Sequence, residues 1–195
     1  MPVLSGVSPD IEQIIRPETA QERHLLQLPE FRHGLCWGEP RFGHPEGKVV
    51  FHVREVLQNI DRIPDLDASS RQDLRLIALA HDTFKYAEDR SRPRNWHFHH
   101  GRIARRFMEA HTDNQVVLDI IELHDDAYYA WLAERYEWRE DVQPRTLSSL
   151  MQSVAHCAQL YYLFFKCDTR TGDKTQAPLK WFELNAPHIQ KVTLL

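Results

Sequence analysis

Several histidines and aspartates in this chain stand where a helix would otherwise present only apolar side chains. His52 lies inside the run VVFHVREVLQNI, His81 and Asp82 follow LRLIALA, and His124 follows VVLDIIEL. Burying an imidazole or a carboxylate costs free energy unless the group is paired, hydrogen-bonded or bound to a metal ion. Such groups on apolar faces therefore predict a shared partner, and their mixture of nitrogen and oxygen donors indicates divalent metal ions.

The candidate metal ligands come from five predicted helices and are His52, His81, Asp82, His97, His124 and Asp168. The set holds no thiolate, which favours Fe, Mn, Co, Zn or Mg as the cofactor. A carboxylate can bridge two cations, so we expect two ions, with Asp82 as the bridge and as a catalytic residue. Lys85 lies three residues after Asp82 and four after His81, which on a helix is the same face. We therefore predict that Lys85 is also catalytic and faces an anionic substrate without binding metal.

Each of these residues also has a simpler interpretation. A single histidine on an apolar helix face is more often a hydrogen-bonded core residue than a ligand, although six coinciding residues favour metal. Lys85 could only offset the helix dipole, and Asp168 could only cap the RTGD turn that follows it. His100 could replace His97, and Asp125 could be a structural partner or a ligand.

The elements that would carry these residues are helices, because the apolar residues recur at spacings of three and four. We expect two short helices before residue 35 and five longer ones over about residues 49–60, 71–85, 96–108, 114–126 and 146–168. Loops rich in Gly, Pro or charge separate them at 35–48 and 89–95. No alternating strand pattern competes, so the predicted fold class is all-α, a compact helical bundle around the metal site.

Length and composition predict one domain with one core. The chain has 195 residues and is 42% hydrophobic, which fills a single core. We expect a helical cover over residues 1–35, a metal-binding core over 44–168 and a C-terminal extension over 169–195. The net charge is only -4 and the charges are interspersed, which argues against an extended nucleic-acid surface.

The same composition bears on location. No apolar run approaches the roughly 20 residues that span a bilayer, so we expect no membrane partner. Three cysteines without a CxxC pair are typical of a reducing compartment, which predicts a cytoplasmic protein.

At ALAHDTFK the sequence resembles the HD superfamily of metal-dependent phosphohydrolases, in which a buried His-Asp doublet precedes Lys in HDxxK spacing. GHPEGKVVFHV resembles the start of that domain in bacterial tRNA nucleotidyltransferases, which implies that His52 is the first ligand. HFHHGRIARRF resembles the family histidine placed four residues before a glycine, which implies His97. IIELHDD and FFKCDTRTGD supply the matches to His124 and Asp168. The resemblance spans residues 44–168 and adds support to the ligand set.

The ordered ligand set resembles the binuclear branch of this superfamily. The GYP signature of cyclic-di-GMP phosphodiesterases is missing, and Lys85 stands where alarmone hydrolases have HDxxED. We therefore expect hydrolysis of a phosphomonoester or phosphodiester, in a small nucleotide-like molecule, by a metal-activated hydroxide. The alternative is a mixed-valence diiron oxygenase similar to myo-inositol oxygenase, which shares the ligand order. A module with a purely structural metal is disfavoured, because such sites seldom use six ligands.

Overall fold

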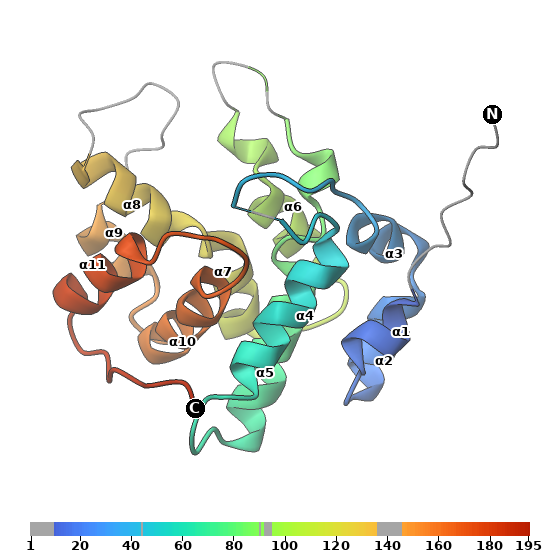
Figure 1. Cartoon of the computed structure of the whole chain (residues 1–195), viewed down its shortest axis with the longest axis horizontal. Helices are drawn as coiled ribbons and strands as arrows, with labels where there is room; N and C mark the ends of the chain where they lie inside the picture. Colours follow the sequence, from blue (N-terminus) through green and yellow to red (C-terminus); the bar gives the residue numbers. More distant parts are fainter. Residues whose placement is uncertain (1–9, 44, 90, 92–94, 136–145) are drawn as a thin grey trace.

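All regular elements that the structure describes are helices, as the sequence predicts. The computed structural model describes residues 10–43, 45–89, 91, 95–135 and 146–195, and within them there are eleven α-helices and two short 3₁₀-helices (Figure 1). Residue 44 of the predicted HPEG loop and residues 90 and 92–94 of the predicted charged loop lie outside this description. The all-α prediction is confirmed for the described part of the chain.

Three short helices, one more than expected, form the N-terminal cover. They are α1 (Ile11–Ile15), α2 (Ala20–Gln27) and α3 (Pro29–Leu35). Pro29 begins α3, a position where the missing N–H of proline costs no intrahelical hydrogen bond. Buried Arg75 holds this cover against the bundle, because its Nε donates to buried Glu22 Oε1 at 2.9 Å.

The centre of the molecule is built from α4 (Val49–Ile60), α5 (Ala68–Ala80) and α10 (Ala158–Thr169), which contact one another pairwise. The predicted apolar stripes on these helices are buried in the hydrophobic core. However, α5 ends at Ala80, five residues earlier than predicted, and the 3₁₀-helix η1 (Lys85–Ala87) follows after a turn. The HDTFK segment is therefore mostly a turn rather than the last turns of an α-helix.

Two antiparallel helices bring the next histidines toward this centre. After the 3₁₀-helix η2 (Trp96–Phe98), α6 (His100–Met108) packs against α7 (Gln115–Leu123). A Cβ at Gly101 would lie only 2.8 Å from the carbonyl oxygen of Glu122. Glycine is therefore what allows the start of α6 to touch the end of α7, where His124 stands.

The C-terminal part differs most from the prediction. The single helix expected over 146–168 is two, α9 (Leu147–Ser153) and α10, joined by a turn. Ser153 Oγ donates to the carbonyl oxygen of Ser149 at 3.1 Å, a side-chain bond that competes with regular helix geometry. The helices α8 (Asp126–Arg135) and α11 (Ala177–Asn185) were not predicted. The buried residues of α8 include Asp126 and alanines, so it carries no clear apolar stripe.

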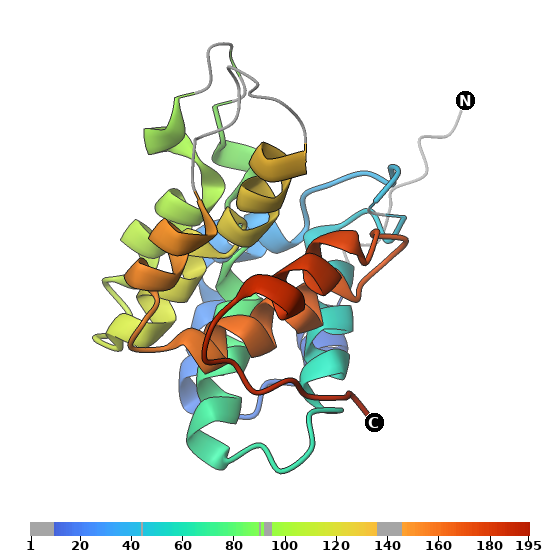
Figure 2. The same cartoon turned by 90° about the vertical axis from the view of Figure 1, so that its left-hand side faces the viewer.

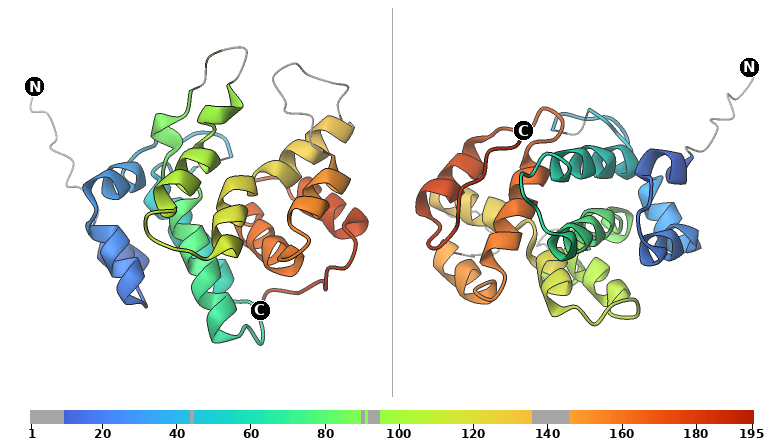
Figure 3. Two further views of the ribbon diagram at one scale, coloured as in Figure 1. Left: turned by 180° about the vertical axis from the view of Figure 1, so that it is seen from behind. Right: turned by 90° about the horizontal axis from the view of Figure 1, so that it is seen from below.

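Figures 2 and 3 show how the parts are arranged. The N-terminal helices α1–α3 lie on one side of the α4–α5 pair, and α8–α11 lie on the other. No described helix is long and apolar enough to cross a bilayer.

Candidate metal centre

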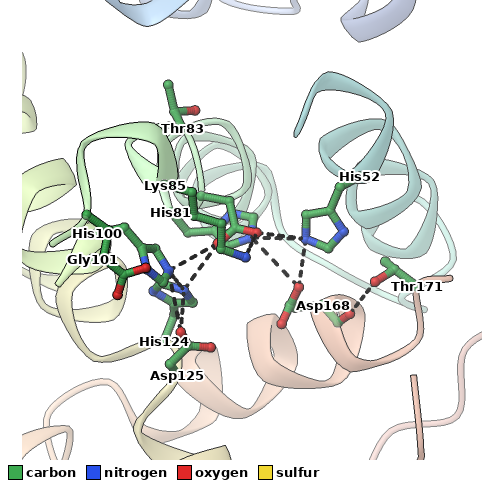
Figure 4. A network of polar contacts seen from close by, with 12 residues as sticks. His52, His81, Thr83, Lys85, His100, Gly101, His124, Asp125, Asp168 and Thr171 are labelled. Atoms are coloured by element: carbon green, nitrogen blue, oxygen red, sulfur yellow. Dashed lines mark hydrogen bonds and ion pairs between the residues drawn. The ribbon is translucent and has the colours of Figure 1, made fainter. Parts of the chain in front are cut away.

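Four buried imidazoles point their Nε2 atoms toward one region between the helices. The Nε2 atoms of His52 and His81 lie 3.2 Å apart, and those of His100 and His124 lie 3.1 Å apart. Figure 4 shows these rings approaching from four different elements. His52 lies inside α4, whereas His81 and His124 cap the ends of α5 and α7 and His100 begins α6.

The first half of the cluster, here called the α4 half-site, consists of His52, His81 and Asp168. Asp168 Oδ1 lies 3.0 Å from His52 Nε2 and 3.7 Å from His81 Nε2. The three ligand atoms lie within 4.8 Å of one another. Two imidazoles and one carboxylate at this spacing can hold one divalent ion.

The second half, the α6 half-site, consists of His100, His124 and Asp125. Asp125 Oδ2 lies 3.4 Å from His100 Nε2 and 3.6 Å from His124 Nε2. Asp125 directly follows the residue that caps α7, and its side chain is 27% exposed. The α6 half-site thus repeats the donor set of the α4 half-site.

Asp82 joins the two half-sites through its two carboxylate oxygens. Oδ2 lies 3.5 Å from the Nε2 atoms of both His52 and His81, whereas Oδ1 lies 3.3 Å from His100 Nε2 and 3.5 Å from His124 Nε2. Oδ1 is buried, and none of the described residues makes a hydrogen bond of good geometry to it. A buried carboxylate oxygen of this kind fits a cation bound next to it. With one oxygen facing each half-site, the Asp82 carboxylate could bridge two cations.

The outer ring nitrogens of two histidines are fixed by the backbone. His81 Nδ1 lies 2.9 Å from the carbonyl oxygen of Ala78, and His124 Nδ1 lies 2.8 Å from that of Ile121. A carbonyl oxygen accepts only, so each Nδ1 carries a proton, and Nε2 is left as the nitrogen that can bind a metal ion. That is the tautomer a metal-binding imidazole needs.

The other two histidines face carboxylates in the same way. His52 Nδ1 lies 3.3 Å from Glu46 Oε1, and His100 Nδ1 lies 3.4 Å from Glu88 Oε2. Both glutamate side chains are 4% exposed. A carboxylate behind a ring orients the imidazole and strengthens it as a ligand. Thus each of the four rings has an oxygen atom near Nδ1 and turns its Nε2 toward the cluster.

The carboxyl groups of the site stay ionised although they are buried. Burial opposes ionisation of Asp82, but Lys85 and the surrounding histidines hold the pKa of that carboxyl well below its usual value. The pKa of Asp125 and that of Asp168 are lowered against burial in the same manner. Burial also lowers the pKa of His81, which favours its neutral form. Burial also opposes protonation of His124, but Asp125 and Asp82 raise its pKa to about 9, so a metal ion bound there would displace a proton.

A cavity of about 380 Å³ opens onto this cluster. Asp82, Asp125 and Asp168 line it, together with Lys85 and Lys174. Lys85 Nζ donates to Asp82 Oδ2 at 2.5 Å, and Lys174 Nζ donates to Asp168 Oδ1 at 2.9 Å. Both ammonium groups therefore sit at the edge of the carboxylates, where they can also meet a bound anion.

The structure brings together five of the six predicted ligands, namely His52, His81, Asp82, His124 and Asp168. It does not bring His97 to them, because His97 belongs to η2 and its side chain is exposed. His99 caps α6 and is buried beside Asp125, whereas the Nε2 of His100, the alternative left open above, lies 3.1 Å from that of His124. The interval of four residues before glycine therefore selects a histidine of the run HFHH that lies outside the cluster.

Some residues of the site were not predicted from the sequence, or were predicted with a different local structure. Glu46, Glu88 and Lys174 were not assigned roles, because loop residues have no periodicity that would reveal where they point. Lys85 does contact Asp82, but from a 3₁₀-turn rather than an α-helical face. Arg105 of α6 is paired with acidic residues of α6 and α7, including Asp119 at 2.5 Å.

No family model, curated protein or solved structure matches the chain. Its function has to be inferred from the chemistry of the cluster itself.

Proposed function

We propose that the chain is a metal-dependent phosphohydrolase of the HD superfamily, acting on a phosphomonoester or phosphodiester of a small, nucleotide-like molecule. One observation carries the proposal: two similar half-sites share Asp82 beneath a cavity that two lysines also line. Paired cation sites under a cationic rim suit phosphoryl chemistry, in which negative charge on the transferred group must be neutralised.

The proposed ligands are one more than the sequence predicted. His52, His81 and Asp168 would hold one ion, His100, His124 and Asp125 the other, with Asp82 shared. Divalent ions there would lower the pKa of a water molecule and polarise phosphoryl oxygens. Imidazole and carboxylate donors suit Fe, Mn, Co or Zn, with Mg as a further candidate.

The remaining steps belong to side chains of the chain itself. Lys85 and Lys174 bind and orient the phosphoryl group through charge, since each ammonium has three donors and only part of them meets a carboxylate. Glu46 and Glu88 keep the rings of His52 and His100 in place. Lys85 contacts Asp82 but is not itself a proposed ligand. Loss of Lys85 would therefore alter the charge at the reacting group without removing a ligand.

The experiment begins with the metal content of protein purified with and without oxygen, followed by phosphate release from a panel of phosphoesters with each metal. Lys85→Met should keep metal and fold but lower turnover by about a hundredfold, the effect of losing one preorganised charge-stabilising group. Lys180→Met, which changes an exposed lysine of α11 outside the cavity, is the matched control. If Lys85 only offset a helix dipole, turnover would stay unchanged and stability would fall by roughly a few tenths of a kcal/mol.

The same experiment separates the hydrolase from the diiron oxygenase that the sequence also suggested. An oxygenase would consume dioxygen in its iron-loaded form and release no phosphate from any ester. Phosphate release in the absence of dioxygen would support the hydrolase. Two lysines lining the cavity favour that outcome, because they provide charge for an anionic group.

A further inference from the structure

The mouth of the cavity carries aromatic side chains that the fold leaves open to solvent. Phe42, in the loop between α3 and α4, is 92% exposed, and Tyr128 of α8 is 39% exposed. Few large apolar side chains in the described chain are exposed, and these two line the same cavity. Exposed aromatic side chains that line one cavity indicate a binding surface, whereas single scattered ones do not.

The cavity therefore has a charged end and an apolar end. Lys85, Lys174 and the carboxylates form the first, whereas Phe42, Tyr128 and the buried side chain of Phe165 line the second. In the metal-loaded protein, a ligand that fills both ends would carry an anion for the ammonium groups and the ions, and a flat apolar group for the other end. The volume of about 380 Å³ suits one small molecule rather than a polymer.

The loops that carry the two ends are tied together. Gly43, next to Phe42, donates its N–H to Asp173 Oδ1 at 2.8 Å, and Asp173 precedes Lys174. Gly172 donates its N–H to Glu55 Oε2 of α4, also at 2.8 Å. Gly172 has φ +54°, and a Cβ there would lie 3.0 Å from Pro45 Cδ. The aromatic group and the ammonium are thus held in one preorganised arrangement.

We infer that this cavity takes a phosphomonoester whose organic group is a planar aromatic ring, with the phosphate between Lys85 and Lys174 and the ring against Phe42 and Tyr128. This inference rests on the proposed function in that it concerns the same site. It goes further by making Lys174, Phe42 and Tyr128 determinants of specificity. A planar ring can stack on aromatic side chains with the whole of its face. A small alkyl group on the same phosphate buries less apolar surface against them.

The test is a binding measurement that needs no turnover. Phenylphosphonate and methylphosphonate carry the same anionic group but cannot be hydrolysed as esters, so calorimetry of the full chain can compare their dissociation constants. It is done with metal loaded and after chelation. We expect phenylphosphonate to bind at least roughly tenfold more tightly, as expected for one aromatic contact.

The variants separate the two ends of the cavity. Phe42→Ala and Tyr128→Ala should weaken phenylphosphonate and leave methylphosphonate unchanged, whereas Lys174→Met should weaken both by roughly tenfold. Matched controls are Phe98→Ala, an exposed aromatic residue outside the cavity, and Lys180→Met. Neither control should change either dissociation constant.

Equal affinity for the two phosphonates, no binding of either, or indifference to Phe42→Ala and Tyr128→Ala would overturn the inference. Phosphate release is measured separately on phenyl phosphate and on an alkyl phosphate. The expected binding pattern without phosphate release would leave the inference standing and remove the proposed function. Equal kcat/KM on the two esters, unchanged in Phe42→Ala, would keep the function and remove the inference.

Discussion

The α4 half-site and the α6 half-site have the same donors but are built in different ways. His52, His81 and Asp168 lie within or at the end of the long helices that form the centre of the core. In the α6 half-site, His100 begins a helix, and Asp125 lies in the turn between α7 and α8. Two of the three ligands of the α4 half-site thus lie inside helices, whereas all three of the α6 half-site lie at or beyond helix ends.

The neighbours of the two half-sites differ as well. Asp168 of the α4 half-site pairs with Lys174, a permanent cation. Asp125 of the α6 half-site instead lies 3.5 Å from His99 Nε2, and burial lowers the pKa of His99 to about 4. Outside the ligand sets, Asp168 therefore has a permanently charged neighbour, whereas Asp125 has the neutral imidazole of His99. Variants can test whether the two halves also act separately.

The largest effect is expected from the residue that both halves share. Asp82→Ala should remove both ions and all turnover, since it takes one carboxylate oxygen from each half-site. Elemental analysis of the purified variant checks this. Asp113→Ala, which changes an exposed aspartate between α6 and α7, is the control and should keep both ions. Equal metal content in wild type and Asp82→Ala would contradict the bridge.

The next prediction concerns the histidine that sequence spacing misplaced. His100→Ala should lose the ion of the α6 half-site and keep that of the α4 half-site, because His52, His81 and Asp168 remain intact. His97→Ala should keep both, since its side chain is exposed on η2. Metal titration of the two variants measures the difference. Loss of metal in His97→Ala, with full retention in His100→Ala, would restore the ligand predicted from the motif.

This contrast explains how much of the site could be predicted from the sequence. His52 and Asp168 stand within apolar stripes whose period fixes the direction of every side chain, and both lie in the cluster. His100 could not be separated from His97, because a 3₁₀-turn and a helix start intervene and no period runs through them. The same holds for the helices: α4 was predicted at its observed bounds, whereas the stripe-poor α8 was missed. Tertiary contacts, rather than periodicity, determine those segments.

A smaller effect should come from the glutamates behind the rings. Glu46→Gln should weaken metal binding in the α4 half-site, and Glu88→Gln should weaken it in the α6 half-site, each by roughly 10–100-fold. The reason is that a neutral amide attracts the ring of His52 or His100 less than the carboxylate does and orients it less firmly. Competition with a chelator of known affinity measures each site. Equal weakening of both half-sites by either variant would show that they are one coupled unit.

The last prediction concerns stability rather than binding, namely the pH dependence of the metal-free protein and the role of His99 beside the α6 half-site. Burial lowers the pKa of His99 to about 4, although Asp125 opposes this. The unfolded chain takes up a proton on His99 near its ordinary pKa of 6.5, whereas the folded chain does not. Stability is therefore lost as the pH falls from about 6.5 toward 4, by up to about 3 kcal/mol from this group.

His99→Asn tests that assignment while keeping the start of α6. Gly101 N–H donates to His99 Nδ1 at 3.2 Å, and asparagine also caps helix N-termini well. Urea unfolding of chelated wild type and variant, at a series of pH values, should give parallel stability curves above pH 6.5. Below it, wild type should lose stability more steeply, because only its unfolded state gains that proton. Curves that stay parallel down to pH 4 would place the acid sensitivity in other groups and leave the α6 half-site without a titrating neighbour.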